Sequence, residues 1–250
     1  MKISINLVLI VLCNTLNAEL IVDIIEKMES TLRPKDISNK MTMILSNSKG
    51  KIQNKIMVSK SMDTGKLQLI WFLEPKSDKG ISFLKIQNND GINQMKIWLP
   101  AFKKTRRIAA NKKEDSFMGS DLSYSDLMIR KKDEYNYMLI DHILFEKDSC
   151  YIIEVSPKVN NSIYKKYNLW LLKKTFRVKK EDLYDFNDIL IKTKKYKYIE
   201  VKGFNILKEI EVHNFEKDHK TKVVFSDIKI DTGLETTFFH ERNLKRIPPF

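Results

Sequence analysis

Alternation of apolar and polar residues along most of the chain constrains its fold more than any other feature. After Pro34, the side chains of Met41, Met43 and Leu45 alternate with polar neighbours, which is the two-residue period of a half-buried β-strand. Residues 47–50 (NSKG) then supply a tight turn into a second strand. Strands joined by tight turns pair as antiparallel neighbours, so the chain is predicted to be mainly β.

The same pattern predicts further strands along nearly the whole chain. They are expected at Ile52–Val58, Leu67–Leu73, Ile81–Ile86, Met95–Leu99, Tyr135–Leu144, Cys150–Val155, Tyr167–Leu172, Thr175–Val178, Leu190–Val201, Ile206–Asn214 and Lys222–Ile230. Short polar turns are predicted at residues 89–91 (NDG), 146–148 (EKD) and 216–218 (EKD). A meander of this length is expected to curl into an open or closed antiparallel barrel.

The segment before Pro34 has a different period. Apolar residues recur at helical spacing through Leu20–Met28, with charged residues between them, which predicts an amphipathic helix. This helix could be a lid over an apolar sheet or could simply fill the core. Short helices are also predicted at Tyr124–Ile129 and Thr236–Leu244, and Ser123 and Asp126 have the spacing of a capping box.

Residues 1–18 have the layout of a cleavable signal peptide. Lys2 precedes an apolar run of about half the ~20 residues needed to span a bilayer, and Ala18 is the expected last residue before cleavage. A retained anchor and lipidation of Cys13 are the alternatives. Cleavage would leave Cys150 as the remaining thiol, so no intramolecular disulfide is expected. The predicted location is the periplasm.

Residues 19–250 are predicted to form one domain, because no Pro/Gly/Ser-rich linker or repeat divides them. The formal net charge is +13, which in a cytosolic protein would suggest nucleic acid. The signal peptide removes the chain from that partner. The charge therefore indicates attraction to anionic headgroups or to an acidic envelope protein, or else a solvated surface.

Enzymatic motifs do not support a catalytic function. The sequence has no G-x-S-x-G elbow and no phosphate-binding glycine-rich loop. His142, His213, His219 and His240 have no metal-ligand spacing. The chain is predicted to be a non-enzyme without metal or cofactor, which leaves an unrecognised hydrolase as the enzymatic alternative.

Residues 95–127 (MKIWLPAFKKTRRIAANKKEDSFMGSDLSYSDL) carry the pattern W-L-P…R-R-I…S-F-M-G-S-D-x-S-Y-x-D-L. This pattern resembles outer-membrane lipoprotein-sorting proteins, which are similar to the periplasmic carriers LolA and LolB. Weaker pieces follow in the expected order, including F-L-E-P at 72–75, C-Y-I-I-E at 150–154 and F-S-D-I at 225–228. The resemblance covers most of residues 65–245, whereas residues 180–195 fit it poorly.

The resemblance implies an incomplete antiparallel β-barrel around a hydrophobic cavity, with helices as a lid or plug. It also implies a periplasmic carrier of a lipid or acylated lipoprotein. Some members of the family are thought to serve lipid-exporting transporters of the RND type. A second possibility is therefore an accessory protein that docks on such a transporter without carrying lipid itself. The chain is predicted to be a monomer with peripheral membrane contact.

Three sets of candidate binding residues follow. In-phase apolar residues on strongly apolar strands are predicted to line the concave face and bind acyl chains, although a core role is the alternative for each of them: Leu67, Leu69, Trp71, Met95, Ile97, Leu99, Ile153 and Leu171. A basic cluster of Lys103, Lys104, Arg106 and Arg107 is predicted to bind headgroups or a partner, or to be solvated. A loop with Phe117, Met118, Gly119 and Asp121 is either ligand-proximal or a structural turn.

Overall fold

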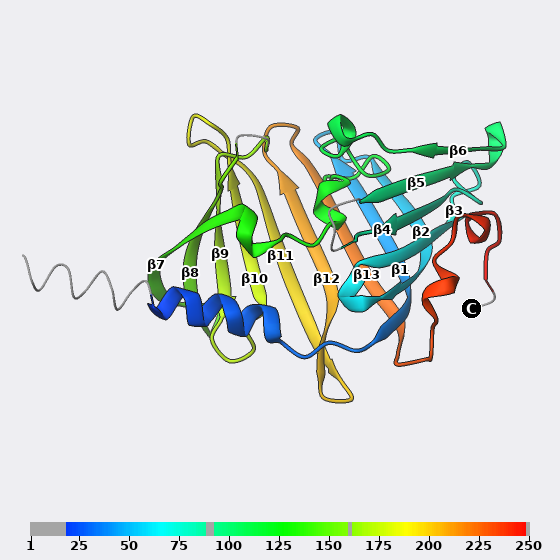
Figure 1. Ribbon diagram of the computed structural model, residues 1–250. Coiled ribbons are helices and arrows are strands. Elements are labelled where there is room, and N and C mark those ends of the chain that lie inside the picture. The colour runs from blue at the N-terminus through cyan, green and yellow to red at the C-terminus, as the bar shows by residue number, and fades with distance from the viewer. Residues whose placement is uncertain (1–18, 89–92, 160–161, 249–250) are drawn as a thin grey trace, which may run out of the picture. The chain divides into compact units, whose positions relative to one another are not determined.

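Thirteen antiparallel strands and one helix form the protein in a computed structural model that describes residues 19–88, 93–159 and 162–248 (Figure 1). The signal peptide predicted at 1–18 and the turn predicted at 89–91 lie outside the described residues. Residues 19–30 form the helix. The strands are β1 (Asp36–Asn47), β2 (Ile52–Met62), β3 (Leu67–Glu74), β4 (Ser82–Ile86), β5 (Gln94–Leu99), β6 (Lys104–Arg107), β7 (Tyr135–Phe145), β8 (Asp148–Pro157), β9 (Lys166–Leu172), β10 (Val178–Tyr184), β11 (Leu190–Val201), β12 (Phe204–Asn214) and β13 (His219–Ile230).

The sheet is open. Its strand order is β6-β5-β4-β3-β2-β1-β13-β12-β11-β10-β9-β8-β7, so β6 and β7 are edge strands. Every neighbour in that order except the β1–β13 pair is also a neighbour in sequence, which confirms the predicted meander. The fold class is therefore confirmed as an incomplete antiparallel β-barrel.

Most predicted strands are present within a few residues of their predicted ends, and Leu190–Val201 has the predicted bounds. The strand predicted at Thr175–Val178 is wrong. Phe176 adopts a positive φ of 50° in a turn, and the strand begins only at Val178. The helices predicted at Tyr124–Ile129 and Thr236–Leu244 are only 3-10 turns, η4 (Ser125–Leu127), η6 (Thr236–Phe238) and η7 (Glu241–Lys245). The remaining 3-10 turns are η1 (Asp63–Gly65), η2 (Pro100–Phe102), η3 (Ala110–Lys112) and η5 (Lys132–Glu134).

The chain divides into two compact units. Of the described residues, the first unit contains those up to Leu32 and those from Arg130 to Thr193, and the second contains those from Arg33 to Ile129 and those from Lys194 onward. Strand β11 contributes its first four residues to the first unit and the rest to the second. The prediction that residues 19–250 are a single domain stays a prediction.

In the first unit, the N-terminal helix packs against the sheet. Ile21, Ile24 and Ile25 are buried and belong to one cluster with Ile153 of β8 and Leu171 of β9. Their spacing of three and four residues places them on one helix face, while Val22 remains 57% exposed. The predicted amphipathic helix is therefore present, and its apolar face covers the sheet.

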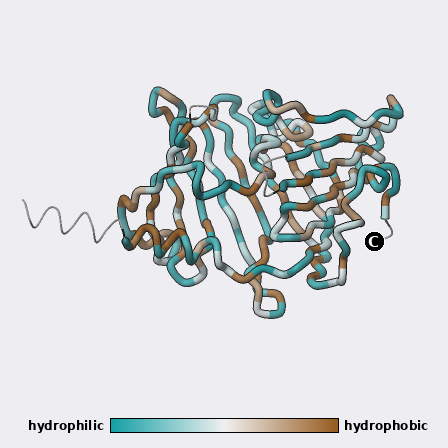
Figure 2. The backbone as a smooth tube through the Cα atoms, in the orientation of Figure 1, coloured by the Kyte–Doolittle hydropathy of each residue, from teal (hydrophilic) through white to brown (hydrophobic). Residues whose placement is uncertain are grey.

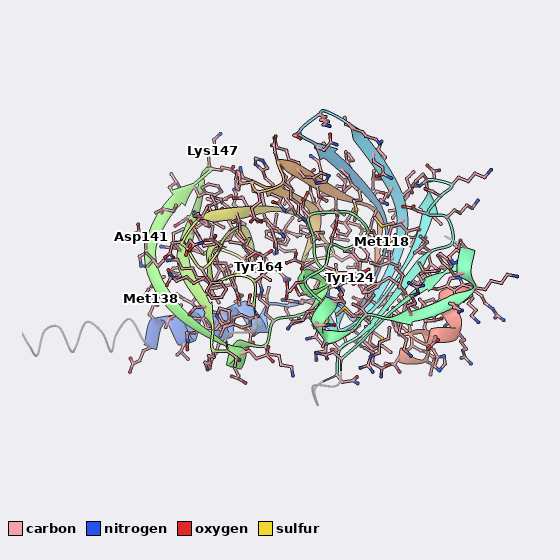
Figure 3. All side chains as sticks on the ribbon, turned by 90° about the horizontal axis from the view of Figure 1, so that it is seen from above. Met118, Tyr124, Met138, Asp141, Lys147 and Tyr164 are labelled. Atoms are coloured by element: carbon pink, nitrogen blue, oxygen red, sulfur yellow. The ribbon has the colours of Figure 1, made fainter. Side chains whose placement is uncertain are left out.

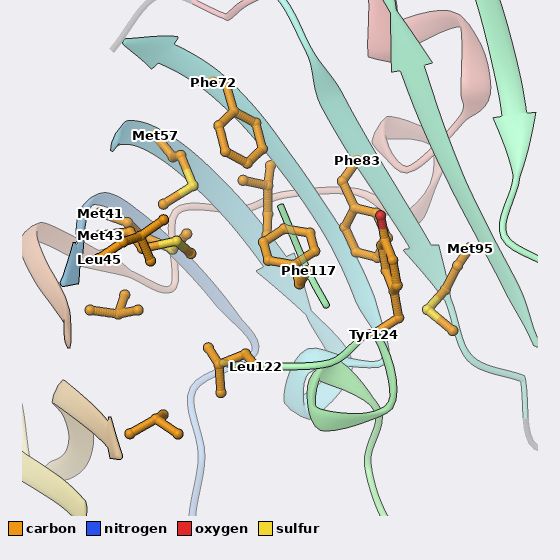
Figure 4. Close-up of a cluster of buried hydrophobic side chains, with 13 residues drawn as sticks. Met41, Met43, Leu45, Met57, Phe72, Phe83, Met95, Phe117, Leu122 and Tyr124 are labelled. Atoms are coloured by element: carbon orange, nitrogen blue, oxygen red, sulfur yellow. The ribbon is translucent and has the colours of Figure 1, made fainter. Parts of the chain in front are cut away.

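The second unit has an apolar cluster on each face of its part of the sheet. Residues 115–129, here called the plug, contribute Phe117, Leu122 and Tyr124 to the cluster on one face (Figure 4). Residues 232–248, here called the tail, contribute Phe239 and Leu244 to the cluster on the other face. Both faces are thus covered by segments without regular secondary structure, which the two-residue period does not predict. Hydropathy varies along the tube in Figure 2, and apolar residues recur along the strands.

Candidate functional site

The eight predicted lipid-binding residues do not share one face. Leu69 and Trp71 are fully buried in the tail-side cluster, and Leu67 packs against it. In the register, Ile70 is opposite Phe83, and Phe83 is opposite Ile97. Directly paired residues point to the same side of a sheet, so Ile97 lies on the plug side with Met95, and by alternation so does Leu99.

The prediction that all eight residues line one face is therefore wrong, because Leu67, Leu69 and Trp71 lie on the face opposite to that of the three β5 residues. Strand β3 is apolar on both faces, so its sequence does not reveal which residues point to which side. Ile153 and Leu171 lie in the first unit and are fully buried against the helix cluster. Acyl-chain binding by the eight residues stays a prediction.

The tail fixes Trp71 in place. The Trp71 indole Nε1–H donates to the carbonyl oxygen of Asn243 at 3.1 Å, and the Ser82 hydroxyl donates to the carbonyl oxygen of Leu244 at 2.6 Å. The ring of Phe238 lies 6.1 Å from that of Trp71. A surface pocket of about 350 Å³ opens on the tail, lined by Gly233, Leu234, Glu235, Thr237, Phe238, Arg242 and Asn243.

The plug is centred on Phe117. Its ring centroid lies 5.3 Å from that of Phe83, 5.6 Å from that of Tyr124 and 6.2 Å from that of Phe72 (Figure 4). Such offset and edge-on arrangements are favourable for aromatic rings. Met118 and Gly119 both have positive φ, 54° and 82°, and make the tight turn that follows. Phe117 thereby packs on the apolar face that bears Phe72, Phe83 and Met95, of which only Met95 was predicted to bind a ligand.

Polar contacts attach the plug to β13 and stabilise its own turn. The Asp121 N–H donates to Thr221 Oγ1 at 2.8 Å, and the Thr221 hydroxyl donates to Asp121 Oδ2 at 2.7 Å. The Ser123 N–H donates to Asp126 Oδ2 at 2.8 Å and the Asp126 N–H to Ser123 Oγ at 3.2 Å, which confirms the capping-box pair. These contacts favour the structural-turn interpretation of the loop.

Two residues that the sequence analysis missed attach the end of the plug to β4. The Lys85 ammonium donates to the carbonyl oxygen of Leu127. The Gln87 side chain donates to the carbonyl oxygen of Ile129 at 2.7 Å and accepts from the Ile129 N–H at 2.8 Å. Burial lowers the pKa of Lys85 to about 8. The sequence did contain one indication that Lys85 points toward the plug. Lys85 lies two residues after Phe83 on the same strand, so the two side chains lie on the same face.

The predicted basic cluster lies on the β5–β6 hairpin at the edge of the sheet. Lys103 has a left-handed conformation with φ 47° at the turn, and Lys104, Arg106 and Arg107 are exposed along β6. Arg106 is opposite Ile97 and Arg107 is opposite Lys96, so the two guanidinium groups point to opposite faces. Phe102 at the hairpin tip is 63% exposed, and the Arg106 guanidinium lies 5.6 Å from its ring centroid.

The first unit holds an ion pair near its helix cluster. Arg130 donates two hydrogen bonds to the Glu181 carboxylate at 3.0 and 3.1 Å, a bidentate geometry. Its guanidinium also lies 4.3 Å from the ring centroid of Tyr167. Burial raises the pKa of Tyr137 to about 12. Tyr164 lies inside the curve of this unit's strands, whereas Met138 and Asp141 lie on its outer side (Figure 3).

The described residues contain no candidate metal site. Within them, no group of three or more His, Cys, Asp or Glu side chains is placed to hold a metal ion. Cys150 is a buried free thiol whose pKa is raised by burial. None of the helices in the described part of the chain has the length and apolarity to cross a bilayer. The non-enzyme prediction stays a prediction.

Solved structures define the class of protein to which this fold belongs. A putative outer-membrane lipoprotein-sorting protein domain from Vibrio parahaemolyticus is 27% identical, with a TM-score of 0.84 over 90% of this chain and 97% of that one. A DUF1329 family protein from Desulfovibrio piger is 26% identical, with a TM-score of 0.81 over 89% and 96% of the two chains. A LolA superfamily protein from Nitrosomonas europaea has the same fold at 17% identity, with a TM-score of 0.68 over 88% and 97%.

The resemblance to outer-membrane lipoprotein-sorting and LolA-like proteins is therefore confirmed. A family model described as "Uncharacterized protein" matches residues 64–246, and the chain belongs to that family. No curated protein matches the sequence significantly.

Proposed function

We propose that the protein is a periplasmic carrier that binds the acyl chains of a lipid or lipoprotein on its apolar inner surfaces. The observation that carries this proposal is the way in which these surfaces are covered. In the second unit, a single irregular segment, the plug, covers the face that bears Phe72, Phe83 and Met95. In the first unit, the N-terminal helix covers Ile153 and Leu171.

A covering segment of this kind can be exchanged for an acyl chain. Each methylene moved from water to an apolar surface contributes roughly 0.8 kcal/mol, so a chain of ordinary length can compete with the few side chains that the plug buries. The likeness to a lipoprotein-sorting domain supports the same function, as does the sheet that does not close on itself. Passage through the periplasm follows from the predicted signal peptide.

The basic hairpin is the proposed contact with the donor or acceptor membrane. Lys103, Lys104, Arg106 and Arg107 are exposed on the same hairpin as Phe102, and the Arg106 guanidinium lies 5.6 Å from the centroid of its exposed ring. Cations near an anionic lipid surface each contribute about 1 kcal/mol of attraction, and an aromatic ring is favourable at headgroup depth.

An accessory role at an RND-type envelope transporter is the second candidate. The observation that favours it is that Phe117 and the helix isoleucines already fill the apolar faces of their units. In that role the covering segments would be permanent, and no lipid would bind.

Native mass spectrometry of the mature protein purified from periplasm separates the two functions. One bound acylated molecule per protein, identified after organic extraction, is the result expected for a carrier. A mass without ligand that does not change after incubation with envelope lipids would contradict carriage and support the accessory role.

A further inference from the structure

Three buried lysines of the second unit differ in how their charge is balanced. Lys55, Lys85 and Lys194 are exposed by 6%, 2% and 2% respectively. Lys55 forms an ion pair with Asp78, and Lys194 forms one with Asp126. Among the described residues, Lys85 has no carboxylate within ion-pair distance, and its ammonium donates a hydrogen bond to the carbonyl oxygen of Leu127.

Lys85 lies beside the plug-side apolar cluster. In the register it lies between Gln68 of β3 and Met95 of β5. Phe83, two residues earlier on the same strand, points to the same side and packs in the plug-side cluster with Met95 and Tyr124. Lys85 therefore lies at the border of the plug-side cluster, and its ammonium contacts Leu127 near the end of the plug.

A buried ammonium with one neutral acceptor is unfavourable for folding. Removing a charge from water costs several kcal/mol unless an opposite charge and hydrogen bonds replace the hydration. The lowered pKa of Lys85 has this cause. A residue that destabilises the empty protein is expected at positions that serve a ligand.

We propose that Lys85 is the anchor for the anionic group of a single-chain amphiphile, a carboxylate or a phosphate, whose acyl chain lies on the plug-side face. The anion replaces the Leu127 carbonyl as the partner of the ammonium. The acyl chain replaces Phe117, Leu122 and Tyr124 on Phe72, Phe83 and Met95. This inference rests on the proposed carrier function and adds the chemical class of the ligand and the residue that selects it.

The test measures how three ligands of equal chain length displace a neutral fluorescent probe, N-phenyl-1-naphthylamine, from the mature protein. The ligands are dodecanoic acid, dodecyl phosphate and uncharged dodecanol. We expect the two anions to displace the probe from the wild type at concentrations at least tenfold lower than dodecanol. The stronger of the two anions identifies the source, a fatty-acid carboxylate or a phosphate headgroup.

Lys85→Met and Lys85→Gln are expected to lose this preference while dodecanol binds as before. Both variants are expected to fold, because they remove a buried charge. Lys220→Met, which removes the same charge from an exposed position on β13, is the matched control and should keep the preference.

Equal displacement by all three ligands in the wild type, or an unchanged preference in both Lys85 variants, would overturn the role of Lys85 and leave carriage intact. Failure of the wild type to bind the probe and all three ligands would overturn the carrier function and this inference together.

Discussion

Thr221 Oγ1 both accepts a hydrogen bond from the N–H of Asp121 at 2.8 Å and donates one to the carboxylate of Asp121 at 2.7 Å. The two residues are 100 positions apart in the sequence. This pair holds the plug on β13, and both residues are buried. The plug is thus attached by polar contacts at Thr221 and at Lys85, with aromatic packing between them.

Replacing Thr221 with valine is expected to destabilise the protein by about 1–3 kcal/mol, because the buried Asp121 N–H and carboxylate each lose a partner. Chemical denaturation measures the free energy of unfolding. Thr236→Val, at an exposed position, is the control and should change it little. A Thr221→Val variant as stable as the wild type would mean that this pair does not hold the plug.

Replacing Ile24 with alanine is expected to cost about 2–5 kcal/mol, the usual range for truncating a buried isoleucine. Ile24 is 1% exposed, between the helix and the sheet of the first unit. Val22→Ala on the exposed side of the same helix is the control. If both variants unfold at the same denaturant concentration, the helix is not docked through this face.

The basic hairpin is expected to bind vesicles that contain phosphatidylglycerol and to leave pure phosphatidylcholine vesicles unbound. Replacing both Arg106 and Arg107 with glutamine should reduce partitioning of the protein onto the anionic vesicles roughly 30-fold, because each cation contributes about 1 kcal/mol of attraction. Phe102→Ala should also weaken it, because the exposed ring is lost. Vesicle sedimentation measures both effects.

The chain offers matched controls for this experiment. Phe186 is 53% exposed and lies in another turn, beside Asp185 and Asp188, so Phe186→Ala should have no effect. Lys217→Gln with Lys220→Gln removes the same charge from exposed positions elsewhere. If this pair reduces binding as much as the Arg106 and Arg107 changes, net charge and not the hairpin is responsible.

The protein is expected to become more stable at alkaline pH because of Lys85. Its pKa is near 10.5 in the unfolded chain and about 8 in the folded protein. Between these values the unfolded chain holds more protons, so the free energy of unfolding rises with pH, by at most about 3 kcal/mol. Lys85→Met lacks this rise. The difference in free energy of unfolding between Lys85→Met and the wild type should therefore be largest below pH 8 and shrink toward pH 10.5. Denaturation measures both values, and the difference between them removes the contributions of the other titrating groups.

The protein is expected to lose stability in acid because of Asp36. Burial raises the pKa of Asp36, but hydrogen bonds from the Thr232 hydroxyl and from the N–H groups of Thr232, Leu234 and Gly233 outweigh it and lower the pKa below 3.8. The stabilisation is present above about pH 4 and is lost as the pH falls through the lowered pKa. Asp36→Asn should therefore cost about 1–3 kcal/mol at neutral pH and less in acid. Asp227→Asn, at an exposed position, should show neither effect.

Most of the strands were predictable because they have a two-residue period bounded by turn residues. Leu190–Val201 and the turn after Asn47 are examples, whereas β6 was not predicted and β10 was misplaced. The face of each β3 residue was not predictable, since Leu69, Ile70, Trp71 and Phe72 are all buried and the period vanishes. Their sides follow from pairing with β4, which depends on contacts between strands rather than on local sequence.

The candidate site was predictable in part. The sequence singled out Phe117 and the basic hairpin but not Lys85, because one lysine in an apolar strand is ordinarily solvent-facing. Its ammonium contacts Leu127, 42 residues later, and the position of Leu127 beside β4 has no periodic signal in the sequence. In the tail, a helix was predicted at Thr236–Leu244, but its form as two 3-10 turns and its place over the sheet were not predictable, since 3-10 turns lack an amphipathic repeat.

The strand order has a consequence for how copies of the chain behave in a crowded compartment. A sheet with two free ends can grow from molecule to molecule, the β7 edge of one copy joining the β6 edge of the next, and such a head-to-tail contact has no natural stopping point. Strand β7 has 11 residues, whereas β6 has four, three of which are exposed cations. A short cationic edge is a poor template for a new strand. Pairing of β7 with the β6 edge of another copy is therefore disfavoured. Head-to-tail polymerisation needs both edges, so it is disfavoured as well.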